Sequence, residues 1–526
     1  MQSVMSHQFN QIPKIDIPRS QFNRSHCHKT TFDSGYLVPI FCDEVLPGDS
    51  FKLRASLFAR LATPIYPVMD NMFLETFFFY VPNRILWDNW KKFMGEQTNP
   101  GDSTAYVVPT VPTTAGGHAT GSLFDYLGVP THKHPMSVNA LFSRAYNLIY
   151  NEWFRDQNLQ NSAVVNKGDG PDLASDYVLR RRNKKHDYFT GCLPWPQKGT
   201  AISVPLGSSA AVRGIGLAAG QATSAQNNIW ESGASATRNY TQGVSTLVTL
   251  ETSGATPVSG TNKPTIYADL STATASTVNQ LREAFQLQRL LERDARAGTR
   301  YTEIIQAHFG VTSPDARMQR PEYLGGSSTR ININTVAQTS VANATYTTPI
   351  GTLAGYGIAT DTFHGFSKSF TEHGVIIGLV NVRADLTYQQ GLDRKFSRST
   401  KYDFYWPGLA NLGEQPVLNK EIFFQGLSAD NNVFGYQERW AEYRHFPSKI
   451  TGKFRSNASG TLDAWHLSQN FGALPTLNSS FIEDNPPISR VVAVPSQPQI
   501  IFDSFFQLSC ARPMPTYSVP GLIDHF

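Results

Sequence analysis

Polar and apolar side chains alternate along the first third of the chain. In residues 51–57 the odd positions are apolar and the even positions carry Lys, Arg or Ser. A period of two is typical of a strand with one buried face. A turn signal, Pro47-Gly48-Asp49, precedes this segment, and a predicted strand at 36–46 precedes the turn. We predict further strands at 72–81, 374–388 and 500–510. The aromatic run 77–80 is suited to burial on both faces.

A helical period appears only between these β-rich ends. Short amphipathic patterns at 84–94, 139–158, 278–296 and 300–309 place apolar residues three or four positions apart. Gly298 is a plausible helix stop. Regular alternation of strands and helices is missing, which disfavours a parallel α/β enzyme fold. The pattern therefore predicts a mainly β protein, a sandwich with long inter-strand insertions that contain short helices.

Two segments differ from the rest. Residues 203–262 hold only four charged side chains among Ser, Thr, Ala, Gly, Gln and Asn. Low charge argues against a disordered charged tail, and a structureless loop of that length is improbable without a function. Residues 1–32 are polar, basic and interrupted by Pro13 and Pro18. We predict an N-terminal extended arm at 1–32 and a single domain at 33–526 that carries a surface insertion at about 203–262.

Composition narrows the function classes. The chain has 526 residues, of which 40% are hydrophobic and 16% charged, below the ~25% charged residues of ordinary domains. Much uncharged surface favours contact with other protein. The net charge of +4 is small for this length, so a protein that wrapped nucleic acid alone is disfavoured. Four scattered cysteines predict free thiols in a reducing compartment, and we expect no signal peptide and no membrane span.

The common catalytic spacings are absent from the sequence. We find no GxSxG, HExxH or GxxxxGK[ST] pattern, and the glycines at 214, 216 and 220 lie in the low-charge segment. His26-Cys27-His28 cannot converge on one metal ion in an extended segment, where neighbouring side chains point to opposite sides. We therefore expect no enzyme activity, no catalytic residue, no metal site and no cofactor.

The densest charge run is a candidate for nucleic-acid contact. It comprises Arg180, Arg181, Arg182, Lys184 and Lys185, with Tyr177, Tyr188, Phe189 and Trp195 nearby. As an exposed patch it would bind phosphates of any sequence and weaken with salt, and the aromatic rings could stack on bases. The alternative is an ordinary solvated face. To this run we add the arm residues Arg19, Arg24 and Lys29 as candidate DNA contacts.

Several long strings resemble one known family. They are 25–32 (SHCHKTTF), 151–159 (NEWFRDQNL), 193–199 (LPWPQKG), 294–296 (DAR), 298–303 (GTRYTE), 308–311 (HFGV), 313–317 (SPDAR) and 320–326 (RPEYLGG). Together they resemble the major capsid proteins of the gokushoviruses, small icosahedral single-stranded DNA phages of the microvirus family. Residues 203–262 are unmatched, at a position where that family carries a variable insertion.

The resemblance implies an eight-stranded antiparallel jelly roll and a T=1 capsid of sixty copies around circular single-stranded DNA. It implies threefold protrusions built from the insertion and used in host recognition, for which Trp230, Arg238 and Tyr240 are our candidates. The implied partners are further copies of the chain, an internal scaffolding protein, a pilot protein, a small basic DNA-binding protein and a host surface receptor. The implied locations are the virion and, during assembly, the host bacterial cytoplasm.

The residues alone leave two other classes of protein as alternatives. A carbohydrate-binding or carbohydrate-cleaving β-sandwich would show exposed aromatic residues beside paired carboxylates. The acids are scattered here, and no catalytic pair can be named. An adhesin or tail component would also be β-rich, and would form open fibres instead of closed shells.

Overall fold

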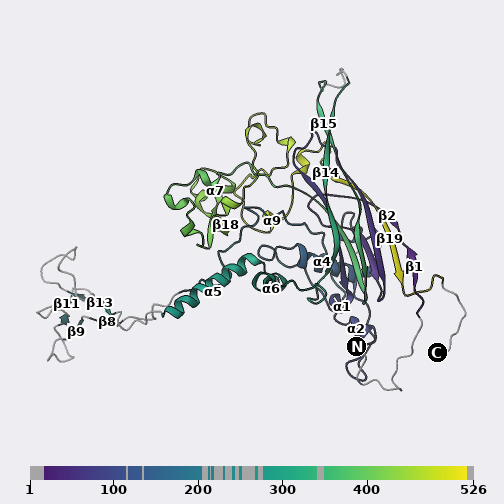
Figure 1. Ribbon diagram of the computed structural model, residues 1–526, viewed down its shortest axis with the longest axis horizontal. Coiled ribbons are helices and arrows are strands. Elements are labelled where there is room, and N and C mark those ends of the chain that lie inside the picture. The colour runs from purple at the N-terminus through teal and green to yellow at the C-terminus, as the bar shows by residue number, and fades with distance from the viewer. Residues whose placement is uncertain are drawn as a thin grey trace. The chain divides into compact units, whose positions relative to one another are not determined.

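The computed structural model describes residues 17–113, 116–132, 135–203, 211–213, 215–217, 229–231, 240–242, 248–250, 267–269, 277–340 and 349–517. The chain divides into two compact units. One comprises Met1–Pro196 with Asp294–Phe526, and the other comprises Gln197–Arg293. The β-sandwich belongs to the first unit (Figure 1).

Eight antiparallel strands of the first unit form the sandwich. They are β2 (His26–Phe32), β3 (Val38–Val45), β4 (Ser50–Leu61), β5 (Met72–Pro82), β14 (Glu322–Ala337), β15 (Leu353–Ser369), β16 (Gly374–Ala384) and β19 (Ile500–Arg512). Together with β1 (Ser20–Asn23) these strands form one continuous nine-stranded sheet, which turns between β15 and β14. Its two halves, called the two sheets of the sandwich below, have the orders β2-β19-β4-β15 and β3-β16-β5-β14. Each sheet thus interleaves early and late strands of the chain, which is the double Greek-key order of a jelly roll. The predicted fold class is confirmed.

The two sheets are joined through β14 and β15. The first part of β14, as far as Ile331, pairs with β5, and the part from Asn332 onward pairs with β15. β15 then leaves β14 at Ile358 and pairs with β4. The shared part of this hairpin extends beyond the sandwich (Figure 1).

Glycines allow the close approach of strands at this corner. Gly325 follows a register shift in β14, and a Cβ atom there would lie 2.7 Å from the carbonyl oxygen of Gly365 on β15. Only a residue without a side chain fits this distance. The Gly-Gly pair that ends the last motif string is therefore explained by backbone packing.

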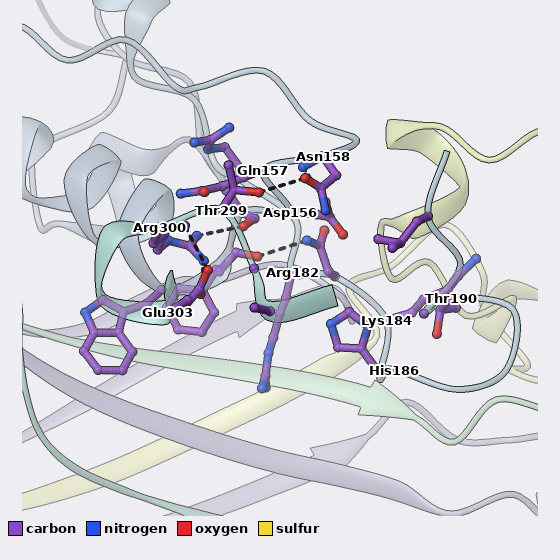
Figure 2. A pocket seen from close by; sticks show the side chains of 18 of the residues that line it. Asp156, Gln157, Asn158, Arg182, Lys184, His186, Thr190, Thr299, Arg300 and Glu303 are labelled. Atoms are coloured by element: carbon purple, nitrogen blue, oxygen red, sulfur yellow. Dashed lines mark hydrogen bonds and ion pairs between the residues drawn. The ribbon is translucent and has the colours of Figure 1, made fainter. Parts of the chain in front are cut away.

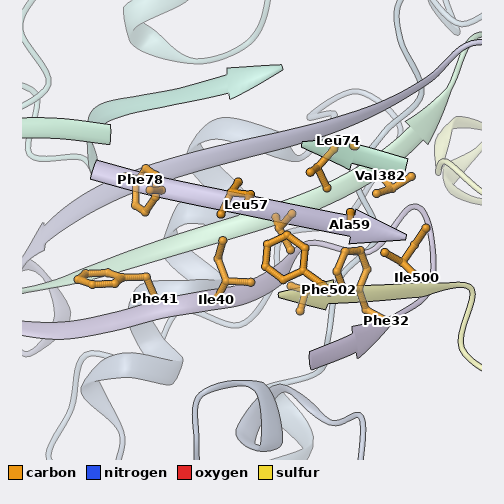
Figure 3. Packing of buried hydrophobic residues seen from close by; sticks show 14 of the residues in the cluster. Phe32, Ile40, Phe41, Leu57, Ala59, Leu74, Phe78, Val382, Ile500 and Phe502 are labelled. Atoms are coloured by element: carbon orange, nitrogen blue, oxygen red, sulfur yellow. The ribbon is translucent and has the colours of Figure 1, made fainter. Parts of the chain in front are cut away.

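The main core lies between the two sheets. Along β4 the apolar side chains from Phe51 to Leu61 are buried at every second position, as the alternation predicted. β19 contributes Ile500, Phe502, Phe506 and Leu508 in the same way. Aromatic rings pack side by side on the neighbouring strands β2 and β19, with Phe32 and Phe502 centred 5.8 Å apart (Figure 3). Rings also meet between the two sheets, where Phe41 of β3 and Phe506 of β19 are centred 5.3 Å apart. Each large apolar side chain buried here stabilises the fold by roughly 1.5–3 kcal/mol.

A second core covers the outer face of the β3-β16-β5-β14 sheet. Phe79 and Val81 of β5, with Val375, Ile377 and Leu379 of β16, pack into this cluster. The covering layer belongs to the connection between β5 and β14. It contains α1 (Asn83–Leu86), α2 (Trp90–Phe93), α3 (Leu123–Tyr126), α4 (Leu141–Ile149) and the hairpin of β6 (Thr110–Pro112) with β7 (Ser137–Asn139). The predicted two-sided burial of β5 is confirmed.

Two predicted helices are interrupted. The segment 84–94 forms α1 and α2, because the chain becomes extended at Trp87. The indole there is fully buried and donates a hydrogen bond to Asp169 at 2.7 Å. The segment 139–158 forms α4, followed by one π-helical turn (Tyr150–Phe154). Burial of the Trp87 side chain explains why the first of these helices is interrupted.

Part of the predicted arm belongs to the sheet. β1 (Ser20–Asn23) pairs with the C-terminal end of β19, and β2 pairs with its N-terminal end. The sequence pattern did not predict these strands, because apolar and polar residues do not alternate in them and their pairing partner β19 is far along the chain. Residues 1–16 lie outside the described residues.

The connection between β16 and β19 forms its own small core. It contains β17 (Glu414–Leu418), α7 (Asn419–Ile422), β18 (Val433–Glu438), α8 (Ala441–Arg444) and α9 (Ser479–Ile482), with several single 3-10 turns. Val417, Ile422 and Phe434 pack there against Tyr188 and Phe189.

Short β pairs characterise the second unit. β8 (Ala211–Arg213) pairs with β13 (Tyr267–Asp269), β9 (Ile215–Leu217) with β10 (Ile229–Glu231), and β11 (Tyr240–Gln242) with β12 (Val248–Leu250). α5 spans Val278–Ala297. In the first unit α6 spans Tyr301–Phe309 and ends at Gly310, whose φ is +69°. The two helices predicted at 278–296 and 300–309 are confirmed.

Candidate assembly and nucleic-acid surfaces

The basic run 180–185 is held along its backbone by neighbouring segments. The amide of Leu37 donates to the carbonyl of Arg180, and the amide of Arg182 donates to the carbonyl of Gly35. The side chains then meet aromatic faces. The guanidinium of Arg181 lies 4.0 Å from the ring centre of Tyr36, and that of Arg180 lies 5.7 Å from the ring centre of Tyr150.

Arg182 forms an ion pair with Glu75 of β5. Arg383 of β16 reaches the same carboxylate at 3.0 Å. Burial alone would raise the pKa of Glu75, but the two guanidiniums lower it below its ordinary value. Burial and the charge of Arg383 lower the pKa of Arg182 to about 10. This cluster ties the run to the sheet.

The two lysines of the run also have internal partners. Lys184 is 5% exposed, and its ammonium donates to Gln469 at 3.0 Å and to the carbonyl of Phe481. Its pKa falls to about 8, because burial disfavours the charged form. Lys185 pairs with Asp385 at 2.8 Å. These contacts explain the run without nucleic acid, and Lys184 has no free face for a phosphate. DNA contact by the run stays a prediction.

The three arm candidates lie at the edge of the β2-β19-β4-β15 sheet. Arg19 is exposed and donates to the hydroxyl of Ser50 at 2.8 Å. Arg24 forms a bidentate pair with Asp43. Lys29 is exposed on β2. Their sheet position keeps Arg19 and Lys29 accessible to a phosphate.

The host-recognition candidates fall in the second unit. Trp230 belongs to β10 and Tyr240 to β11, two strands of different pairs. Arg238 lies outside the described residues. Their role stays a prediction.

Five of the motif strings contribute residues to one cleft of about 720 Å³ in the first unit, namely 151–159, 193–199, 294–296, 298–303 and 320–326. Figure 2 shows how the strings interlock: Arg300 pairs with Glu303 at 2.9 Å, and Thr299 donates to Asn158 at 2.8 Å. Arg300 also donates to the backbone carbonyls of Asn151 and Arg155, at 2.7 and 2.8 Å. The two strings 151–159 and 298–303, which are far apart in the sequence, are thus joined by hydrogen bonds.

The cleft carries more positive than negative side chains. Its acids are Asp156 and Glu303. Asp156 caps the backbone amides of Asn158 and Leu159, and Glu303 caps the amide of Arg300. Both carboxylates are therefore engaged in holding the fold. Burial and the nearby charge of Arg300 lower the pKa of Arg155. The spacing of the strings gave no sign that 151–159 and 294–303 would be neighbours.

An exposed aromatic surface lies in the β16–β19 connection. We define it by Phe396, Phe404, Tyr405, Trp406 and Phe446, which are 47–70% exposed. Cations connect its members. The ammonium of Lys395 lies about 5 Å from the ring centres of Phe396 and Phe446, and Arg398 lies 5.4 Å from that of Phe404. Exposed aromatic side chains of this kind make this segment a candidate surface for contact with another molecule. Sequence reasoning missed it, because the same residues could have been core.

Among the described residues, no group of three or more His, Cys, Asp or Glu is placed to hold a metal ion. Cys27 and Cys42 are exposed, Cys192 and Cys510 are buried, and all four are free thiols. In the described part of the chain no helix has the length and apolar character needed to cross a bilayer.

The jelly-roll order with long insertions is the architecture of viral coat proteins, and lectin and cupin domains share the jelly roll. Comparison with known proteins agrees. Residues 10–522 match the family described as capsid protein (F protein). The chain belongs to this family of phage capsid proteins, and the resemblance to gokushovirus capsid proteins is confirmed.

Three relatives match over nearly their whole length, and each is named capsid protein VP1. The protein of Bdellovibrio phage phiMH2K is 48% identical over 526 residues, which cover 99% of this chain and 98% of the relative. That of Chlamydia phage 1 is 45% identical, with coverage of 99% and 98%. That of Spiroplasma virus 4 is 36% identical, with coverage of 98% and 97%.

Proposed function

We propose that the protein assembles as sixty copies into a T=1 icosahedral shell around circular single-stranded DNA. The observation that carries this proposal is the jelly roll with one covered sheet and an exposed aromatic surface. A fold whose insertions expose large aromatic side chains is suited to contact between copies, because aromatic and Arg residues are enriched at protein interfaces. Family membership supports a capsid role.

The parts of the chain take different tasks in this proposal. The jelly roll tiles the shell, and the N-terminal segment with Arg19, Arg24 and Lys29 ties neighbours together and contacts DNA. The insertion at about 203–262 forms threefold protrusions that recognise the host surface receptor. A rigid scaffold with adaptable loops is the usual arrangement for recognition.

The proposal also names partners and places. An internal scaffolding protein and a pilot protein act during assembly, and a small basic protein neutralises most of the DNA charge, since the chain itself carries only +4. Assembly takes place in the host cytoplasm, and the product is the virion shell. The role is structural and not enzymatic, which agrees with cleft carboxylates that are engaged in capping.

Electron microscopy of purified material tests the proposal. The protein is produced with and without the phage's other structural proteins, and particles are imaged and weighed. Closed spheres of uniform size support it. Open fibres would indicate an adhesin or tail component, and a monomer under all conditions would leave a carbohydrate-binding sandwich as the alternative.

A further inference from the structure

The two sheets of the sandwich differ in what covers them. The outer face of β3-β16-β5-β14 carries the second core. In the part of the chain that the structure describes, the outward positions of β4 and β19 are exposed or half-buried, and we call this outer face of β2-β19-β4-β15 the open face. On that open face Phe58 and Phe505 are each 44% exposed, and Ile501 is 55% exposed. Their neighbours at alternate positions face the main core, so the strands cannot turn these side chains inward.

The open face carries unpaired positive charge. Lys52, Arg54 and Arg60 point outward from β4, and Lys29 points outward from β2. None of these four forms an ion pair within the described part of the chain. Among the described outward positions of the four strands, Asp503 is the only acid. The described part of the open face therefore carries four cations and one carboxylate.

The register interleaves the cations with the aromatic rings. Arg60 lies opposite Ile501, Arg54 opposite Gln507, and Phe58 opposite Asp503. Phe505 lies opposite Ser56, which makes it the diagonal neighbour of Phe58 at about 7–8 Å. Two rings thus lie between basic residues on the open face.

We propose that this open face binds single-stranded DNA, with Arg54, Arg60, Lys52 and Lys29 at phosphates and with Phe58 and Phe505 stacked on bases. Cations beside exposed rings on a groove or sheet are the arrangement that sequence-tolerant single-strand binding uses. A second copy of the chain fits less well, because the same face would bring like charges together. This inference rests on the proposed packaging of DNA. It assigns the DNA contact to the open face of the sheet and not to the basic run 180–185.

Binding of the full-length protein to fluorescein-labelled oligothymidylate tests this inference. The charge variant carries Arg54→Gln and Arg60→Gln, and the ring variant carries Phe58→Leu and Phe505→Leu. The matched controls are Lys401→Gln with Lys453→Gln, and Phe309→Leu, all at exposed positions outside the open face and the aromatic surface. Circular dichroism and sedimentation report folding and assembly.

We expect each open-face variant to bind at least about tenfold more weakly than either control. The charge variant should also lose about 1.4 from the slope of log affinity against log salt, at about 0.7 for each lost phosphate contact, while the ring variant keeps the slope. If the wild type assembles and binds DNA, open-face variants that keep its affinity and its salt slope would overturn this inference alone. Variants that bind normally but no longer assemble would make the face a contact between copies, which also overturns it. A wild type that neither assembles nor binds would contradict the proposed function itself.

Discussion

Arg182 forms an ion pair with Glu75 on β5, at the border between the main sandwich and the layer that covers it. The most basic run of the sequence is thus tied to the fold by this pair, and Arg383 shares the same carboxylate. Side chains that looked available for nucleic acid are engaged inside one chain.

Replacing Glu75 tests this cluster. Glu75→Gln should lower the free energy of unfolding by about 3–5 kcal/mol, because it leaves two part-buried guanidiniums without a counter-ion. Urea unfolding of dissociated subunits measures the loss. Arg182→Met should cost less, since Arg383 continues to pair with Glu75.

The exposed pair of Lys91 and Glu96, 3.8 Å apart, is the matched control. Glu96→Gln should change stability by less than about 1 kcal/mol. An effect of Glu75→Gln no larger than that of Glu96→Gln would show that the Glu75 cluster does not stabilise the fold.

A second buried pair holds the helical layer. Arg144 of α4 pairs with Asp172 at 2.7 Å, with side chains 2% and 4% exposed, and also donates to the carbonyls of Leu86 and Gly168. Asp172→Asn leaves a buried guanidinium without its counter-ion and should cost about 3–5 kcal/mol. Scanning calorimetry should show a lower Tm in subunits. A Tm equal to that of the wild type would contradict this assignment.

The pH dependence of stability tests the buried carboxyl of Asp484. Burial raises its pKa from 3.8 to about 6, although Lys184 acts in the opposite direction. Between these two values the folded state binds more protons than the unfolded state, so this group makes the unfolding free energy fall as pH rises. Across this pH range the group should lower the unfolding free energy of the wild type by roughly 3 kcal/mol, and Asp484→Asn should abolish this decrease. Parallel stability curves for variant and wild type across this window would contradict it.

The aromatic surface should matter for assembly and not for folding. Phe396→Ser with Phe404→Ser removes exposed rings, so the subunit Tm should stay within a few degrees of the wild type while closed particles are lost. Analytical ultracentrifugation separates subunits from particles. Leu462→Ser, at an exposed apolar residue outside this surface, is the control. Normal particles from the double variant would show that this surface is not a contact between copies in the shell.

Deleting residues 205–260 separates assembly from host attachment. Because their low charge sets them apart from the rest of the sequence, we expect particles that still form but no longer adsorb to host cells. Adsorption assays and microscopy of the same preparation provide the two readouts. Loss of assembly would instead make the insertion a contact between copies.

Strands with one buried face were predictable from sequence, because β4 and β19 bury every second residue. α5 was predictable from its period. β1 and β2 were not, because their burial comes from pairing with β19, far along the chain. The burial and the internal contacts of Lys184 could not be predicted for the same reason. Its partners Gln469 and Phe481 are supplied by a distant insertion, and a charge run has no periodicity that reveals them.

The mass of the assembled particle tests the central claim most directly. Sixty chains of 58.3 kDa give a protein shell of about 3.5 MDa, and mass photometry or sedimentation of empty particles measures it. The shell account predicts one closed species at this mass, with icosahedral symmetry in averaged images. A chain that stays at 58.3 kDa in the presence of the phage's other structural proteins, or that forms open polymers of unlimited mass, would contradict it.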